Sequence, residues 1–263
     1  MSFVYLIKIT SPLLLDQGMS LVRPVKQVFR VFSTMSKTRF EMYVKAGSDG
    51  KNIGDCPFSQ RVYMYSQLKI PSELVTVIPV DITNKSEEFL KLNPEGKVPV
   101  LVDHEKNKVI ADSGTITGYI HDSFPSPDLH QTYSGPAVEA SGGVFGKLAA
   151  LLKNSDLASI PKLKEDLERE LRTLDDYLNC ADCKGGFLVS DRICELDCAI
   201  LPKLRHVQVA GMYFQGFQIP EDCVALLDYI RKGESTDVFK QTCPKDEEII
   251  NGWSRHNIMV VKQ

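Results

Sequence analysis

This sequence of 263 residues lacks an apolar run as long as the roughly 18–20 residues that a membrane-spanning helix requires. It also lacks a strong charge of either sign, because 31 basic residues nearly balance 34 acidic ones and leave a net charge of −3. There is therefore no electrostatic case for binding nucleic acid. What remains is the composition of an ordinary globular protein, 43% hydrophobic and 25% charged, long enough for two modest domains or one large one.

The sequence also lacks the even, regularly spaced set of cysteines that would form a disulfide framework. It has seven cysteines, and they cluster unevenly along the chain. An odd and uneven set argues against a small secreted protein and favours a reducing compartment.

Acidic residues are scarce at the N-terminus. Asp16 is the only one in residues 1–39, against six lysines and arginines and frequent serines and threonines. A basic, hydroxyl-rich and acid-poor segment is typical of an organellar transit peptide. We therefore predict an N-terminal extension over residues 1–39 and import into a chloroplast or mitochondrion. Two alternatives stay open: an extension without an address, and translation from Met35, which would give a cytosolic protein.

The most informative segment is the Cys-Pro-Phe-Ser motif at residues 56–59. It follows a predicted strand at residues 40–45 and a polar loop, and it opens a predicted helix at residues 57–68. The first turn of a helix has unpaired N–H groups and the positive end of the helix dipole, which favour a thiolate at Cys56. Pro57 suits this turn because it has no N–H group to leave unpaired. Cys56 is therefore predicted to be a nucleophile.

The motif lacks the second cysteine of a C-x-x-C redox pair, because Ser59 occupies its place. A single sulfur cannot form a disulfide with its helix neighbour. A thiol from solution must therefore reduce the oxidised sulfur, and glutathione is the obvious candidate.

The pattern of predicted elements divides the chain into two domains. Residues 40–124 follow the order βαβαββα of a thioredoxin-like domain, and the proline-rich residues 125–136 predict a linker. Residues 137–263 form an all-helical domain, so the predicted fold class is α/β plus all-α. The predicted strands are residues 40–45, 74–82, 98–102 and 108–111, and the predicted helices are residues 57–68, 86–92, 113–123, 144–152, 160–178, 197–209, 223–231 and 245–253.

Further candidate glutathione-binding residues lie at the ends of these elements. Pro99 lies at the start of a predicted strand. In thioredoxin-like folds a proline at this place is cis and faces the cysteine, so the Val98 main chain would be free to pair with glutathione. The alternative is a plain turn. Asp112 and Ser113 begin a helix, where they are ordinary cap residues and where Ser113 can also hold a carboxylate.

Three charged residues each have two possible roles. Lys45 ends the first strand near the loop before the cysteine, and Lys85 would reach a carboxylate of glutathione, but both could be solvated surface residues. Asp55 precedes the cysteine, where it would either cap the helix or orient a polar substrate at the sulfur. Its negative charge opposes formation of a thiolate, so the helix dipole and nearby lysines must outweigh it.

Four cysteines fall within a short stretch of the helical domain, a spacing that invites a zinc site. Against zinc, Cys194 occupies a predicted helix cap with Asp197 at the third helical position, and Cys198 lies inside that helix. We therefore predict no metal site. The four cysteines are either buried or surface thiols, or they form a regulatory disulfide among Cys180, Cys183, Cys194 and Cys198. The five histidines are scattered without catalytic spacing, so each is predicted to be a surface or core residue.

With these residues in view, the sequence resembles the plant-type dehydroascorbate reductases of the glutathione transferase superfamily. The resemblance spans residues 40–253 and is strongest in Gly-Asp-Cys-Pro-Phe-Ser-Gln-Arg-Val at residues 54–62, with further segments at residues 93–100 and 111–113. Shorter matches lie at residues 202–204, 219–220 and 252–253. The resemblance implies the glutathione transferase fold and glutathione-dependent reduction of dehydroascorbate, with a mixed-disulfide intermediate and ping-pong kinetics.

The resemblance also implies roles and partners. Glutathione would be a co-substrate with no bound cofactor, and the protein would be a monomer. Chloride intracellular channel proteins share the Cys-Pro-Phe-Ser core, but charged residues in and beside residues 52–68 make stable membrane insertion unexpected. A general glutathione-dependent thiol transferase, which would use the same residues, is the other alternative. By the resemblance Cys56 is catalytic, Lys45 and Asp55 contact dehydroascorbate, and Lys85, Val98, Asp112 and Ser113 bind glutathione.

Overall fold

The structure is a computed structural model that describes residues 38–129, 135–180, 186–256, 258 and 260. Its contacts divide the chain into residues 1–35 and residues 36–263, and all described residues belong to the second unit. Residues 1–37 of the predicted extension, which include the alternative start at Met35, lie outside the described residues, and so does Cys183.

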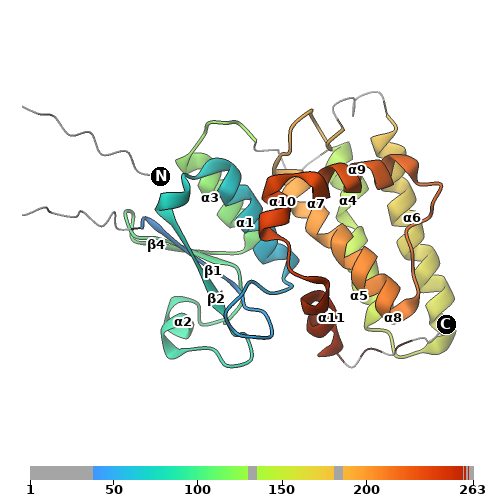
Figure 1. The fold of residues 1–263 in the computed structure, drawn as a ribbon, viewed down its shortest axis with the longest axis horizontal. Coiled ribbons are helices and arrows are strands. Elements are labelled where there is room, and N and C mark those ends of the chain that lie inside the picture. Colours follow the sequence, from blue (N-terminus) through green and yellow to red (C-terminus); the bar gives the residue numbers. More distant parts are fainter. Residues whose placement is uncertain (1–37, 130–134, 181–185, 257, 259, 261–263) are drawn as a thin grey trace, which may run out of the picture. The chain divides into compact units, whose positions relative to one another are not determined.

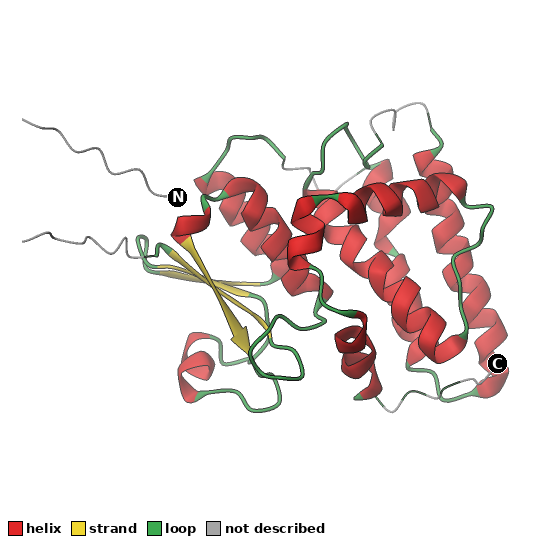
Figure 2. Cartoon of the chain, in the orientation of Figure 1, coloured by secondary structure: helices red, strands yellow, loops and turns green. Residues whose placement is uncertain are grey.

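The N-terminal half of the described chain contains a four-stranded mixed sheet with the strand order β2-β1-β3-β4 (Figure 1, Figure 2). The central strand β1 pairs in parallel with β2 and antiparallel with β3, which pairs antiparallel with β4. Phe40, Met42 and Val44 are fully buried because alternate residues of β1 face the core. The strands are β1 (Phe40–Lys45), β2 (Val75–Val80), β3 (Val100–Asp103) and β4 (Lys108–Ala111).

The helices of this half confirm the predicted order βαβαββα. α3 has the predicted bounds, whereas α2 begins one residue late because Ser86 caps it by accepting the Phe89 N–H at 3.2 Å. β2 is shorter than the predicted strand at residues 74–82, since Asp81 starts a turn by accepting the N–H of Thr83 at 2.8 Å. The helices are α1 (Pro57–Lys69), α2 (Glu87–Leu92) and α3 (Ser113–Ser123).

The second half of the described chain is helical, as predicted. α5 and α6 have the predicted bounds, but α7 begins two residues early and passes at Val207 into a π-helical turn. The sequence pattern does not predict α4, α8 and α10, because seven, four and six residues are too few to show a helical period. The helices are α4 (Pro136–Gly142), α5 (Val144–Leu152), α6 (Ile160–Leu178), α7 (Glu195–His206), α8 (Met212–Gln215), α9 (Val224–Ser235), α10 (Asp237–Thr242) and α11 (Asp246–Ser254).

α1 lies between the two halves. It packs on the sheet beside α3 and also contacts α7 and α10 (Figure 1). Its Val62, Met64 and Tyr65 side chains are fully buried, and one apolar cluster continues from β1 into the helical half. α2 packs on the opposite face of the sheet through a separate small cluster around Phe89. A residue at the start of α1 can therefore be reached by side chains from both halves.

The predicted cap of α7 is confirmed. The Asp197 carboxylate accepts the main-chain N–H of Cys194 and the hydroxyl of Tyr229, both at 2.8 Å. Cys194 and Cys198 are buried free thiols, whereas Cys180 is exposed. Burial raises the pKa of the Cys198 thiol, which makes it unreactive. In the part of the chain that the structure describes, no group of three or more His, Cys, Asp or Glu side chains could hold a metal ion.

Candidate active site

Cys56 occupies the N-cap position of α1. Its Sγ atom accepts the main-chain N–H of Ser59 at 3.4 Å, and its carbonyl accepts the N–H of Gln60 at 3.0 Å. The half-buried sulfur therefore lies at the end of the helix where N–H groups point outward. Because Cys56 itself caps the helix, the alternative that Asp55 caps it is wrong.

Asp55 instead forms an ion pair with Lys45. The Lys45 Nζ atom lies 2.7 Å from Asp55 Oδ1, and only 12% and 11% of the two side chains are exposed. The alternative of a solvated surface lysine is therefore wrong for Lys45. β1 and the loop that follows it bring a fixed positive charge and a fixed negative charge to the start of α1, where the main chain passes directly from Asp55 to Cys56.

Five of the seven predicted site residues line one cavity of about 470 Å³. We call it the Cys56 cavity. Helices α5, α7 and α11 of the second half contribute Phe145, His206 and Trp253 to its wall, so it is built from both halves of the described chain. The predicted residues in its lining are Lys45, Asp55, Cys56, Lys85 and Val98.

The other two predicted residues, Asp112 and Ser113, line a neighbouring cavity of about 450 Å³. We call it the Ser113 cavity. Phe58, Lys97 and Val98 line both cavities, so the two are adjacent. The structure thus brings all seven predicted residues to two adjacent cavities near the N-terminus of α1.

The chain around Val98 has the predicted form. The peptide bond between Val98 and Pro99 is cis. β3 begins at Val100 rather than at Val98, because Pro99 has no N–H group for the sheet. Both Val98 and Pro99 line the Ser113 cavity, so the Val98 main chain remains outside the strand ladder at the point where the cavities meet.

Asp112 caps α3 as predicted. Its Oδ1 atom accepts the N–H groups of Gly114 and Thr115 at 3.0 Å each, and these bonds hold the pKa of the carboxyl below its usual range. Its φ angle of +73° lies in the left-handed region, which is uncommon for a residue other than glycine. Ser113 beside it is buried, and its hydroxyl accepts a hydrogen bond from Arg61 at 3.4 Å.

Lys85 is placed by a glycine. Gly96 has a φ of +64°, and a Cβ atom there would come within 2.8 Å of the Lys85 Nζ atom. The absent side chain therefore leaves room for the lysine to fold back over the loop before β3. Its ammonium group lies in the lining of the Cys56 cavity, in the same wall as Val98.

Two lining residues, His206 and Trp253, are not among the site residues predicted from the sequence. The Trp253 Nε1–H donates to His206 Nδ1 at 2.8 Å. Complete burial lowers the pKa of His206 to about 4, so the imidazole is neutral and carries its proton on Nε2, next to the main chain of Asp55. His206 is a core residue as predicted, yet it also lines the cavity. The signal that points to it is its partner, the one tryptophan of the sequence, which lies in the matched segment at residues 252–253.

Comparisons with known proteins agree with this geometry. The probable cytosolic glutathione S-transferase DHAR1 of Oryza sativa subsp. japonica is 35% identical over 217 residues, which cover 81% of this chain and 96% of that relative. The chain belongs to the dehydroascorbate reductase family of glutathione transferases. The crystal structure of Chlamydomonas reinhardtii dehydroascorbate reductase superimposes with a TM-score of 0.73 at 27% identity, covering 82% of this chain and 98% of that one. The family and the fold implied by the sequence are thus confirmed.

The fold is also shared more widely. The CLIC-like N-terminal domain family matches residues 38–127 of this dehydroascorbate reductase family member. The structure of the CLIC homologue EXC-4 from C. elegans has a TM-score of 0.71 at 24% identity and covers 87% of this chain and 86% of that one, which shows a common fold. Across the described residues, no helix is both long enough and apolar enough to cross a membrane.

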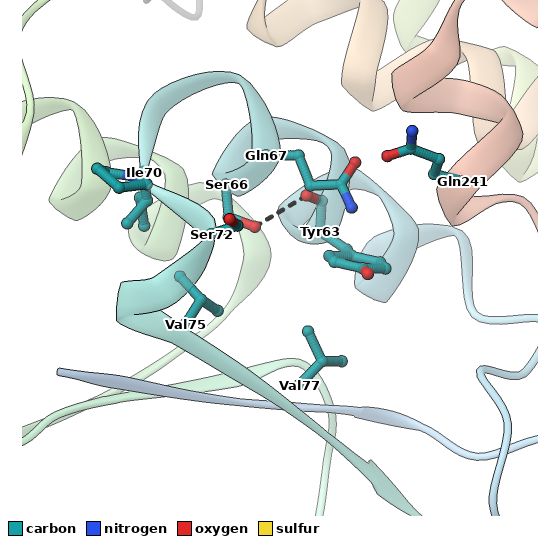
Figure 3. A pocket seen from close by; sticks show the side chains of 9 residues that line it. Tyr63, Ser66, Gln67, Ile70, Ser72, Val75, Val77 and Gln241 are labelled. Atoms are coloured by element: carbon teal, nitrogen blue, oxygen red, sulfur yellow. Dashed lines mark hydrogen bonds between the residues drawn. The ribbon is translucent and has the colours of Figure 1, made fainter. Parts of the chain in front are cut away.

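A third cavity lies at the other end of α1, between that helix and β2 (Figure 3). It contains the Tyr63 ring, the Gln67 amide and the Ser66 hydroxyl, which donates to the Tyr63 carbonyl at 2.9 Å. The remaining lining is formed by apolar, hydroxyl and amide side chains, and none of the lining residues carries a thiol, a carboxylate, an imidazole or an ammonium group. The chemistry of this family member is therefore expected at the Cys56 end.

Proposed function

We propose that this protein reduces dehydroascorbate to ascorbate at the expense of glutathione, with Cys56 as its single nucleophile. The observation that carries the proposal is the position of Cys56. Its sulfur stands at a helix N-terminus, in the wall of a cavity that also holds a buried ion pair and a neutral imidazole. Such a site can activate a thiolate and polarise a carbonyl group at the same place.

The reaction proceeds in two transfers through the sulfur. The Cys56 thiolate adds to a carbonyl carbon of dehydroascorbate, and the carbonyl oxygen takes up a proton. The thiolate of one glutathione then attacks the Cys56 sulfur, the carbon–sulfur bond breaks, and its electron pair leaves with ascorbate. A second glutathione attacks the mixed disulfide, releases oxidised glutathione and restores the Cys56 thiolate. Two glutathiones thereby lose two electrons, which dehydroascorbate gains.

The polar groups of the Cys56 cavity fit the first transfer. The Lys45 ammonium is a donor in the lining and is held by Asp55, whereas the neutral His206 imidazole, fixed by Trp253, is buried beside Asp55. Donors fixed in a partly buried site stabilise the negative charge that develops on a carbonyl oxygen.

The Ser113 cavity fits glutathione. The free main chain of Val98 can pair with the peptide of glutathione, and the α3 N-terminus at Ser113 suits a carboxylate. The Asp112 carboxylate suits the ammonium group of the same γ-glutamyl residue, and Lys85 suits the carboxylate at the opposite end of the tripeptide. Because Val98 borders both cavities, a tripeptide bound in this way would present its thiol towards Cys56.

The test is steady-state reduction of dehydroascorbate by glutathione, measured on residues 35–263 and on the Cys56→Ser variant. We expect ping-pong kinetics in the sense that ascorbate is released, and a Cys56–glutathione mixed disulfide is formed, before the second glutathione adds; ascorbate production should fall by about 10³-fold or more in the variant. Near wild-type activity in the variant would contradict the mechanism. Weak ascorbate production with rapid reduction of a glutathionylated peptide would make the protein a general thiol transferase instead.

We further propose that residues 1–39 direct import into a chloroplast or mitochondrion, which their basic, acid-poor composition supports. Residues 1–39 fused to a fluorescent protein should enter an organelle of a photosynthetic cell, whereas a fusion that begins at Met35 should stay in the cytosol. A cytosolic signal from both fusions would contradict import. We also propose that residues 35–263 form a monomer; sedimentation at the mass of a dimer would contradict that proposal.

A further inference from the structure

The last helix, α11, approaches the loop before Cys56 unusually closely. A Cβ atom built on Gly252 would overlap the Cγ and Oδ2 atoms of Asp55. The carboxylate therefore occupies the space that any other side chain at residue 252 would need. Its second oxygen, Oδ1, accepts the Lys45 ammonium at 2.7 Å, so the group is held between the lysine on one side and the glycine main chain on the other.

Asp55 cannot easily retreat, because the loop main chain is tied to β1. The Gly54 N–H donates to the Lys45 carbonyl at 2.7 Å, and Ala46 forms a bridge with Ile53. A Cβ atom at Gly54 would itself overlap the Ala46 carbonyl, so the two chain segments are already at closest approach. A displacement of the carboxylate would therefore occur by rotation of its side chain, which would break the ion pair.

α11 is fixed as well. Near its start, the Glu248 carboxylate accepts the main-chain N–H of Ser48 at 2.7 Å and its hydroxyl at 2.6 Å, which ties the helix to the same loop. Near its end, Trp253 donates to His206 on α7. The helix thus has attachments on both sides of Gly252 along the chain, and neither leaves it free to move outward to admit a side chain.

Glycine is a poor residue for this position on helical grounds alone. Residue 252 lies inside α11, where alanine would be more favourable than glycine. The glycine is buried, so it is not explained as a flexible surface residue. The close approach of Gly252 to Asp55 explains instead why this position holds a glycine.

We infer that Gly252 is a positioning residue, which sets the place of the Asp55 carboxylate and thereby the direction of the Lys45 ammonium group in the Cys56 cavity. The inference rests on the proposed function, because the positioned pair would bind dehydroascorbate. It assigns α11 a role in the first transfer of the reaction and none in the reduction of the mixed disulfide by glutathione.

The inference is tested with Gly252→Ala in two backgrounds, the natural sequence and Asp55→Ala. In the natural background, we expect Gly252→Ala to lower kcat/KM for dehydroascorbate about tenfold or more, since small displacements of catalytic groups have such effects. In the Asp55→Ala background, where the overlapping carboxylate is absent, the same substitution should change kcat/KM less than about twofold. A similar loss in both backgrounds, or full activity of Gly252→Ala alone, would overturn the inference.

Two further measurements separate this inference from the proposed function. The rate at which glutathione reduces Cys56 glutathionylated beforehand should be unchanged by Gly252→Ala. The unfolding temperature should fall by about 3–8 °C in the natural background and stay level or rise in the Asp55→Ala background, which detects the overlap without any substrate. If the unfolding temperatures behave in this way but the natural protein does not reduce dehydroascorbate, the proposed function fails while the contact stands.

Gly118→Ala is the matched control. Gly118 lies in α3, and a Cβ atom there would meet no other atom within 4 Å. We expect this variant to keep the activity of the natural protein and to unfold at the same or a slightly higher temperature, because alanine favours the helix. A loss of activity as large as that of Gly252→Ala would show that any helical glycine has the effect, and would overturn the inference.

Discussion

The Cys56 cavity and the Ser113 cavity touch each other but are built in different ways. The Cys56 cavity collects side chains from β1, the following loop, α1, α5, α7 and α11, and its Lys45–Asp55 ion pair is mostly buried. The Ser113 cavity is lined by five residues between 93 and 99, by residues 111–113 and by Phe58, all from the N-terminal half. The first therefore depends on how the two halves pack together, whereas the second requires only local turns and one helix cap.

This difference predicts that substitutions in the Cys56 cavity affect both stability and the dehydroascorbate step, while substitutions in the Ser113 cavity affect mainly the use of glutathione.

The largest effect is expected for the buried ion pair. Lys45→Met leaves the Asp55 carboxylate buried without its partner and should lower the free energy of unfolding by about 3 kcal/mol, together with a large loss in kcat/KM for dehydroascorbate. Urea unfolding and steady-state kinetics measure the two.

The control is the doubly neutral variant, Lys45→Met with Asp55→Asn. It removes both charges, so it should recover most of the lost stability without recovering activity. If the single variant Lys45→Met costs less than about 0.5 kcal/mol, as an exposed ion pair would, the two cavities do not differ in the way described.

A smaller effect is expected from acid. The imidazole of His206 has a pKa of about 4 in the folded protein, because burial disfavours its charged form, and near 6.5 when unfolded. As the pH falls, the unfolded chain binds this proton first, so the free energy of unfolding should decrease between pH 6.5 and pH 4, by up to about 3 kcal/mol. Asp55 opposes the shift and Lys45 adds to it, both less strongly than burial.

The measurement is the free energy of unfolding from pH 7 to pH 4, for the natural protein and for His206→Gln. The variant should be less stable at pH 7 but should lose this part of the pH dependence. Asp103, whose pKa is lowered to about 2, contributes only below that range, since its stabilisation is lost between about pH 3.8 and pH 2. Equal slopes for the two proteins between pH 6.5 and pH 4 would mean that His206 is not buried as a neutral group.

The same comparison explains how much the sequence reveals. Much of the Ser113 cavity follows from short segments: the cap at Asp112 and the helix start at Ser113 depend on a few adjacent positions, and the cis peptide before Pro99 is predicted from its place in the thioredoxin-like order of elements. Likewise, α3, α5 and α6 have their predicted bounds, since a regular pattern with clear start and stop residues identifies a helix.

The Cys56 cavity is only partly predictable. Its cysteine, lysine and aspartate lie close together in sequence, but His206 and Trp253 come from helices far along the chain. No local pattern marks His206, because its burial and its hydrogen bond arise only when α7 and α11 pack together. The same holds for Gly252, which reads as an ordinary glycine until the structure places Asp55 against it.

The smallest effect on stability is expected in the Ser113 cavity. Asn at residue 112 can still cap α3 and tolerates a positive φ angle, so Asp112→Asn should change the free energy of unfolding by less than about 0.5 kcal/mol. Asp112→Ala removes the cap and should cost about 1 kcal/mol. Both variants lose the carboxylate that faces the cavity, so both should reduce glutathione-dependent turnover to a similar degree, about tenfold for a lost charge-assisted contact.

The decisive reading is the use of glutathione compared with dehydroascorbate. Reduction of glutathionylated Cys56 by glutathione should slow in both Asp112 variants. The single-turnover reaction of the thiolate with dehydroascorbate should not, because Asp112 is absent from the lining of the Cys56 cavity. If Asp112→Asn keeps full glutathione turnover while Asp112→Ala loses it, the carboxylate serves only to cap α3. Glutathione would then be held by Val98 and the start of α3 alone. The Ser113 cavity would in that case bind glutathione through main-chain groups rather than through the charge of Asp112.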